Sequence, residues 1–432
     1  MGERERAVAA EAAKRLDSSG RRALDRSDVP AAINLLERAA ALLSFDNYAS
    51  AELLPCLGAA LLEAGRLAEA ERVLDDAARC ARAVDDDRLE AHALVEQLSL
   101  RVQVDTDAAT KEIRRASERL RAIFEPRDDD LGLCKLWRLR GLVHWLAGQA
   151  AAADAAWGQA AEHAREAGDG RKAADIACWL ASSAYWGPMP VAPAIRRCEA
   201  IRDDIRDDRY AHAWTLRPLA QLHAMTGRFA VARRLLDESD AALADLGLTL
   251  ALVGSQEESV VAMLAGDVAL AEQCLRRGYE RLGQLGEKAI LSTTAAHLAE
   301  AIYVQGRYDE AWRFTETSEA AAAPDDLDAQ IGWRTVRAKV LAKKGHAEEA
   351  EPLARKAVAL AERTDWLSTR ANALVDLGEV LHAARRSHEA EDAIRGALAL
   401  YELKGNVVAA KKARALWGDP ATAQNPATEV RT

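Results

Sequence analysis

The chain has 432 residues, of which 50% are hydrophobic and 29% are charged. Only 5% are aromatic, while Ala, Leu, Glu and Arg dominate, and this composition is typical of helical proteins. The net charge of −10 argues against nucleic acid as the main partner, and no stretch of eighteen apolar residues is present that could cross a membrane.

The N-terminal segment, MGERERAVAAEAAKRL, is charged and follows a helical pattern, so no signal peptide is predicted. The cysteines are scattered singly, without a CxxC pair, as expected of reduced thiols that fill helix interfaces. We therefore expect a cytoplasmic protein. The six positions are Cys56, Cys80, Cys134, Cys178, Cys198 and Cys274.

A turn pattern recurs along the chain and is clearest in residues 57–81, LGAALLEAGRLAEAERVLDDAARCA. There Gly65 separates two apolar-periodic segments, and the small residue Ala70 follows shortly after it. Equivalent small residues lie about 38 to 44 residues apart, which predicts ten antiparallel pairs, each with a first helix (helix A), a tight turn and a second helix (helix B). In chain order they are Ala32, Ala70, Ala109, Ala153, Ala194, Ala232, Ala271, Ala311, Ala350 and Ala390.

We call these alanines the marker alanines, and two further positions recur at fixed distances from them. A small residue precedes the marker alanine on helix A, where it lets two helices approach closely, and a larger side chain follows the marker on helix B, where it is predicted to be buried. The small residues are Gly20, Gly58, Gly141, Ser182, Ala220, Ser259, Ala299, Ala338 and Gly378. The larger ones are Leu36, Leu74, Ile113, Trp157, Leu236, Leu275 and Ile394.

The fifth unit contains the motif WGPMPVAP at residues 186–193. Its closely spaced prolines cannot continue a helix, so the turn beside Trp186 is predicted to be distorted. The distortion could bend the array and shape a pocket, or it could be an ordinary lengthened loop.

At the C-terminus, YELKGNVVAAKKARALWG is predicted to form a basic helix that caps the last pair. Residues 418–432, GDPATAQNPATEVRT, are predicted to be disordered. We therefore expect a single solenoid over residues 1–417, with no flexible linker between domains.

These repeat positions resemble those of the tetratricopeptide repeat (TPR), and in the fourth unit even the leading tryptophan is matched, by Trp137. The period here is about 39 to 40 residues, longer than the usual 34. The resemblance implies an all-α, right-handed superhelical solenoid of about ten antiparallel helix pairs. Long repeats of this kind are similar to those in the sensor regions of large bacterial signal-transduction ATPases.

Residues 275–365, together with the segment SSGRRALDRSDVPAAINLLERA, resemble the TPR region behind the catalytic and ATPase modules of actinobacterial class III adenylate/guanylate cyclase proteins. No cyclase domain accompanies them, and no GxxxxGK[ST] loop is present. The resemblance implies either a fragment of such a protein or a stand-alone regulator built from its sensor part.

Few residues in the sequence suggest catalysis or the binding of a metal ion or cofactor. Gly278, Gly283 and Gly286 follow no strand and are interpreted as a helix and its end, while the histidines lack metal-ligand spacing. The acidic runs are interpreted as solvated loops and helix starts. We expect no catalytic residue, no cofactor and no metal ion.

In stacked helix pairs, A helices are expected to line a concave face, and fixed offsets from the small helix-A residue select the side chains that point into it. Tryptophan and arginine are favoured binding anchors, although the rings could instead fill space between helices. Trp157 is predicted to be core, as is Trp137. The selected residues are Arg138, Leu142, Trp145, Trp179, Ser183, Trp186, Arg217, Gln221, Met263 and Tyr303, with Trp214 added by the same geometry.

Two functions remain open. The array could be a non-catalytic scaffold or regulatory module that binds a protein or peptide through its concave face. Alternatively, it could be a sensor domain that binds a small molecule inside the superhelix and regulates an attached or partner signalling enzyme. Nucleic acid and membrane are not expected as partners.

Overall fold

A computed structural model describes residues 2–26, 28–104, 106–246, 256–285 and 288–417. Within these residues the chain forms 21 α-helices and one short 3-10 helix, Glu125–Arg127, and no strand. The all-α prediction is confirmed. None of the described helices is long and apolar enough to cross a membrane. The segment predicted to be disordered, 418–432, lies outside the described residues.

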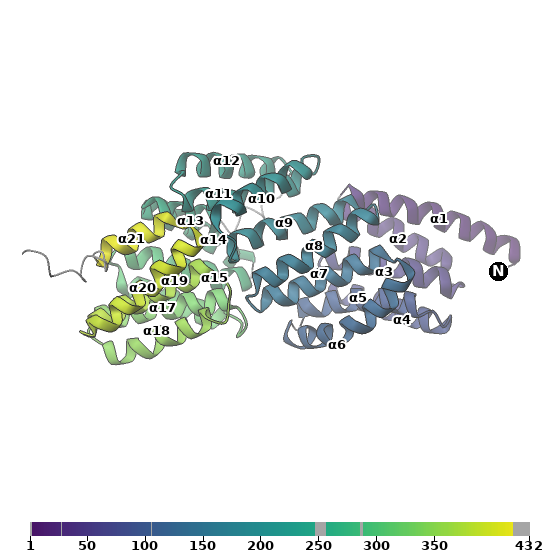
Figure 1. The fold of residues 1–432 in the computed structure, drawn as a ribbon. Helices are drawn as coiled ribbons and strands as arrows, with labels where there is room; N and C mark the ends of the chain where they lie inside the picture. The colour runs from purple at the N-terminus through teal and green to yellow at the C-terminus, as the bar shows by residue number, and fades with distance from the viewer. Residues whose placement is uncertain (1, 27, 105, 247–255, 286–287, 418–432) are drawn as a thin grey trace, which may run out of the picture. The chain divides into compact units, whose positions relative to one another are not determined.

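The first twenty helices form ten consecutive pairs of helix A and helix B, as predicted, and a last helix follows (Figure 1). In chain order they are α1 (Glu3–Asp25) and α2 (Val29–Leu43), α3 (Asn47–Glu63) and α4 (Leu67–Ala83), α5 (Asp87–Val104) and α6 (Thr106–Phe124), α7 (Asp130–Leu146) and α8 (Ala150–Glu166), α9 (Gly170–Trp186) and α10 (Val191–Asp204), α11 (Arg209–Met225) and α12 (Phe229–Asp245), α13 (Gln256–Ala265) and α14 (Val268–Leu285), α15 (Ala289–Val304) and α16 (Tyr308–Ala321), α17 (Leu327–Lys343) and α18 (Ala347–Ala361), α19 (Leu367–Ala383) and α20 (Ser387–Lys404), and α21 (Val407–Trp417).

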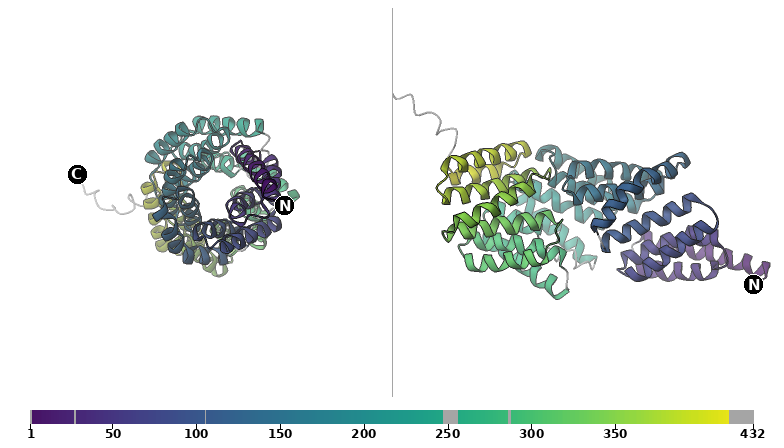
Figure 2. Two further views of the ribbon diagram at one scale, coloured as in Figure 1. Left: turned by 90° about the vertical axis from the view of Figure 1, so that its right-hand side faces the viewer. Right: turned by 90° about the horizontal axis from the view of Figure 1, so that it is seen from below.

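The helices pack into two compact units. Unit 1 comprises Met1–Val143 and Ala156–Ala173, and unit 2 comprises His144–Ala155 and Ala174–Thr432. Within unit 2, the green and yellow helices α15 to α20 lie side by side in chain order (Figure 2). That both units belong to one continuous solenoid over residues 1–417 stays a prediction.

Burial confirms the predicted repeat frame, since the ten marker alanines and the seven larger helix-B residues are all buried. Glycines on helix A allow the close approach that the sequence predicts. A Cβ atom added at Gly58 would lie 2.3 Å from Leu74, and one added at Gly141 would lie 2.2 Å from the Trp157 indole nitrogen. Trp157 is only 1% exposed, so its assignment to the core is confirmed.

The tight turn between the two helices of a pair uses a left-handed residue. Gly65 has a φ of +72° and Gly306 one of +79°, values that glycine adopts without strain. In the tenth pair Arg385 occupies this place with a φ of 62°. The fifth pair departs from the pattern as predicted, because α9 ends at Trp186 and α10 begins only at Val191.

Candidate functional site

The structure distributes the predicted site residues over several places. Arg138 lies half-buried on α7 in unit 1, where its carbonyl oxygen accepts a hydrogen bond from the Trp157 indole nitrogen at 3.2 Å. Met263, at the end of α13, packs half-buried against the core around α15, and its carbonyl oxygen accepts a hydrogen bond from Lys412 Nζ at 2.6 Å.

Leu142 also lies half-buried on α7 in unit 1. Ser183 on α9 is 3% exposed and its hydroxyl donates to Asp154 at 2.6 Å, so the expectation that it faces an open groove is corrected. The remaining predicted residues lie in unit 2, in three groups.

The first group is an aromatic cluster of Trp145, Trp179, Trp186 and Trp366. Ring centroids lie 6.0 Å apart for Trp145 and Trp179, and 5.0 Å apart for Trp186 and Trp366. Trp366 is 7% exposed, and the other three rings are half-buried. Trp145, Trp186 and Trp366 pack with apolar side chains such as Leu327, so the alternative that these rings fill space between helices fits this cluster.

Asp365, the residue before Trp366, connects by hydrogen bonds the two chain segments that meet at this cluster. The Asp365 carboxylate accepts hydrogen bonds from the backbone N–H groups of Ala150 at 2.9 Å and Ala151 at 2.8 Å, at the start of α8. A carboxylate at a helix N-terminus is favourable because free N–H groups point toward it. The loop between α18 and α19 is thereby tied to α8, more than 200 residues earlier in the chain.

The second group surrounds Arg217 on α11 and corrects an expectation. Arg217 is 3% exposed, and its guanidinium donates to Asp240 at 2.8 Å and to Glu257 at 3.0 Å. The half-buried ring of Trp214 lies 6.0 Å from that guanidinium. Gln221 is 5% exposed. Arg217 and Gln221 therefore offer no open surface, because α12 and α13 cover this side of α11.

The third group, which we call the polar row, crosses three successive A helices of unit 2. Lys339 on α17 is its centre, with a side chain that is 3% exposed. Its Nζ donates to Glu300 on α15 at 2.7 Å and lies 2.8 Å from Asp376 on α19. The six members are Glu300, Tyr303, Lys339, Lys343, Asp376 and Glu379.

Tyr303 is the one predicted site residue in the polar row. Its hydroxyl donates to Glu379, which also lies 2.9 Å from Lys343 Nζ, and Lys339 Nζ sits 4.7 Å from the centre of its ring. Tyr303 is 6% exposed, so the expectation of a ring open to a groove is corrected. Tyr303 instead orients a carboxylate and receives a cation on its face.

The polar row brings three carboxylates to two ammonium groups. Burial alone would lower the pKa of Lys339. The attraction of Asp376 and Glu300 is together stronger and raises this pKa above its usual value, so Lys339 stays charged. Burial raises the pKa of Asp376 to about 6, against the attraction of Lys339 and with the repulsion of Glu300. Burial alone would also raise the pKa of Glu379. The opposing effects of Lys339, Tyr303 and Lys343 are together stronger, so this pKa lies below its usual value. The row therefore carries an excess of negative charge at neutral pH.

Part of the polar row is accessible to a partner. The side chains of Glu300, Glu379 and Lys343 are 33%, 30% and 43% exposed. Glu300, Lys339 and Glu379 each follow directly after the small helix-A residue, at one of the offsets that select groove positions. Extending that offset to the last three pairs, and weighting charged residues like aromatic ones, would have found them from the sequence.

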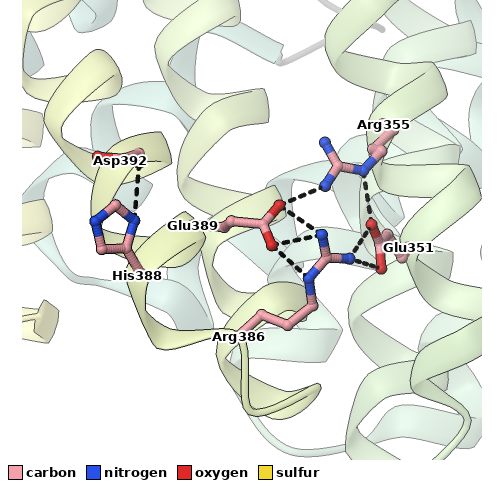
Figure 3. A network of polar contacts seen from close by, with 6 residues as sticks. All are labelled: Glu351, Arg355, Arg386, His388, Glu389 and Asp392. Atoms are coloured by element: carbon pink, nitrogen blue, oxygen red, sulfur yellow. Dashed lines mark hydrogen bonds and ion pairs between the residues drawn. The ribbon is translucent and has the colours of Figure 1, made fainter.

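A second polar network lies on the B helices (Figure 3). Arg386, at the start of α20, bonds to Glu389 at 2.6 Å and to Glu351 on α18, while Arg355 Nε donates to Glu351 at 2.7 Å. Glu272, Arg276, Arg307 and Glu310 repeat this arrangement between α14 and α16. Because it recurs at equivalent repeat positions, this network is part of how neighbouring pairs stack.

Among the described residues, no group of three or more His, Cys, Asp or Glu side chains is arranged to hold a metal ion. All six cysteines are free, and four of them are buried. Among the described residues, surface depressions lie at equivalent places between neighbouring pairs, for example one beside Trp312 and His346 and another beside Ile33 and Arg66. Neither depression includes a predicted site residue or a member of the polar row.

No protein-family model matches the chain, and no curated protein matches it. Among solved structures, the chain is similar to the APC/C hetero-tetramer Cut9-Hcn1, at 13% identity over 94% of this chain and 90% of that one, with a TM-score of 0.48. It is also similar to a Rap protein complexed with competence and sporulation factor, at 12% identity over 85% of this chain and 98% of that one, with a TM-score of 0.46.

Proposed function

We propose that this protein is a cytoplasmic, non-catalytic binding module that holds a protein or peptide partner against the polar row of unit 2. The observation that carries this proposal is the row itself, in which ion pairs connect charged side chains from α15, α17 and α19. Stacked repeats act through extended surfaces of this kind, on which each repeat contributes a few side chains.

The cost of burying Lys339 supports a role beyond stability. A buried ion pair is often no more stabilising than apolar side chains of the same volume, and this chain fills most of its other interfaces with Ala and Leu. Polar side chains at such a place give a partner specific hydrogen bonds and charges to match.

The charges of the polar row define the partner's chemistry. Carboxylates exceed ammonium groups in the row, and Glu300 and Glu379 are the accessible carboxylates. We infer a partner segment that carries lysine or arginine side chains. The chain's net charge of −10 would assist the approach of such a segment.

A regulatory role is the form of this function that the sequence supports best. Residues 275–365 resemble the repeat region of actinobacterial class III cyclase–ATPase signalling proteins, and four of the six members of the polar row are within that segment, namely Glu300, Tyr303, Lys339 and Lys343. We propose that binding at the row regulates a signalling partner.

The test is partner capture by cross-linking in the source cells, followed by mass spectrometry, with matched variants. Glu300→Gln combined with Glu379→Gln should reduce capture of the specific partner at least tenfold, because it removes both accessible carboxylates. Glu348→Gln combined with Glu391→Gln makes the same charge change at exposed positions on B helices α18 and α20. Equal capture by both double variants, with unchanged helicity, would rule out the polar row as the binding face.

Small-molecule sensing is a second candidate, supported by the aromatic cluster. Trp366 is buried, yet its indole nitrogen has no hydrogen-bond partner among the described residues. A buried donor without a partner is costly, and a bound polar molecule would satisfy it.

Native mass spectrometry tests this second function. A small mass should co-purify with the wild type and be lost in Trp366→Phe, which keeps a ring but removes the N–H donor. The control is Trp312→Phe, at a half-buried ring on α16 outside the cluster. A wild-type spectrum with no added mass, or a mass that survives in Trp366→Phe, would exclude the cluster as the site.

A further inference from the structure

The WGPMPVAP motif leaves backbone carbonyl groups without helical partners. The last turn of α9 ends at Trp186, and the prolines that follow prevent the chain from supplying the N–H groups that would continue the hydrogen-bond pattern. The carbonyl oxygens of Ala184, Gly187 and Met189 therefore need donors from elsewhere. Buried carbonyl groups are seldom left unsatisfied.

Lys404, at the end of α20, supplies these donors. Its Nζ donates to the carbonyl oxygens of Ala184 at 3.1 Å, Gly187 at 2.6 Å and Met189 at 2.9 Å. An ammonium group has three N–H donors, so all of them are used. Lys404 is fully buried, and it reaches carbonyls about 215 to 220 positions earlier in the chain.

The residues after Lys404 continue the same contact, and we call residues 404–417 the strap. Gly405 lies against Val191, since a Cβ atom added there would be 3.6 Å from the Val191 nitrogen. Lys412 Nζ donates to the carbonyl oxygen of Met263 at 2.6 Å, and α21 also contacts α11. In Figure 1 the yellow α21 accordingly lies beside the teal α11 and α13.

The strap contact closes unit 2 on itself, because it joins the tenth pair and α21 to the fifth, sixth and seventh pairs. Burying the Lys404 ammonium group, which makes this contact, costs free energy. Among the described residues Lys404 has no ion-pair partner, and burial lowers its pKa to about 7, against small opposing effects of Cys198 on α10 and Asp365 before α19. An apolar side chain would fill the same space without this cost, but it would leave the three carbonyls unsatisfied.

We propose that the strap is a releasable latch, which holds unit 2 closed through Lys404 and opens it when the three carbonyl contacts are broken. The geometry supports release for two reasons. All three contacts depend on one side chain, so they are lost together. The ammonium also gains full hydration once it leaves the site, which offsets part of the loss. The latch does not depend on the polar row or on any partner.

The test is hydrogen exchange with mass spectrometry on Lys404→Met, which keeps the length of the side chain but removes its donors. Leaving the carbonyls unsatisfied should raise exchange about tenfold or more at the end of α9, in the following loop and in the strap. Exchange in α15 to α18 should stay within about twofold of the wild type, and helicity should be unchanged. Lys411→Met is the matched control, because Lys411 is an exposed lysine in the strap, on α21.

Two results would overturn the latch. The first is unchanged exchange at the end of α9 and in the strap, and the second is a uniform rise over all of unit 2, which would show an ordinary core contact. If Lys404→Met does not fold, Lys412→Met decides, since it removes only the exposed contact to the Met263 carbonyl. That variant should raise exchange in the strap several-fold, and exchange equal to that of the wild type would contradict the proposal.

Discussion

At the scale of single residues, the repeat depends on pairs in which a glycine on helix A meets a larger side chain on helix B. Gly141 and Trp157 make the closest such approach, at 2.2 Å from an added Cβ to the indole nitrogen. The sequence predicts this pair because both residues keep fixed offsets from the marker Ala153. It cannot predict that Lys404 meets the loop after α9, since no periodic pattern connects positions 220 residues apart.

Gly141→Ala should therefore destabilise unit 1 by about 1 to 3 kcal/mol, because the new methyl group would overlap the Trp157 ring, which is only 1% exposed and would have to shift within the core. Gly158→Ala on α8 is the matched control, since an added Cβ there meets nothing within 4 Å. That control should be neutral or stabilise the helix by up to about 1 kcal/mol. Thermal unfolding followed by circular dichroism measures both. Equal midpoints for the two variants would refute the close-packing role of Gly141.

At the scale of helices, ionic networks join neighbouring B helices, α14 to α16 and α18 to α20. In the network around Glu272, the carboxylate binds Arg307, Arg276 at 2.7 Å and Gln305 at 2.7 Å. Hydrogen bonding from Arg307, opposed by burial and assisted by Arg276 and Gln305, lowers the pKa of Glu272 from 4.5 to about 2. The sequence shows the charges, but their pairing depends on how adjacent repeats are placed, so single-helix patterns did not predict it.

The lowered pKa gives this network a pH-dependent contribution with a definite sign. Glu272 binds a proton more weakly in the folded state than in the unfolded chain, so its contribution is present above about pH 4.5 and is lost as the pH falls toward 2. Glu272→Gln should lower stability by about 1 kcal/mol at pH 6, after allowance for solvent screening, and by almost nothing near pH 2. Thermal midpoints measured across this range test it. Glu280→Gln, at an exposed position on the same helix, should show no such dependence.

At the scale of the whole molecule, composition and the repeat resemblance predicted the all-α fold, and periodicity predicted the ten pairs and their buried markers. The prolines of WGPMPVAP predicted the break in the fifth pair. The candidate site was predicted only in part. Tyr303 lies in the polar row, but Arg217, Gln221 and Tyr303 are buried rather than open. The reason is physical: a one-dimensional repeat pattern places a residue on an A helix, whereas exposure depends on the neighbouring helices that cover it. Aromatic residues also received more weight than the charges that make the polar row.

We propose that unit 2 binds a basic segment through Glu300 and Glu379. The most direct measurement is the affinity of lysine- or arginine-containing peptides, selected by display on the wild type and titrated by calorimetry. Glu300→Gln combined with Glu379→Gln should weaken binding at least tenfold, while Glu348→Gln combined with Glu391→Gln should leave it within twofold. Selection of no basic peptide, or equal affinity for both double variants, would contradict the claim.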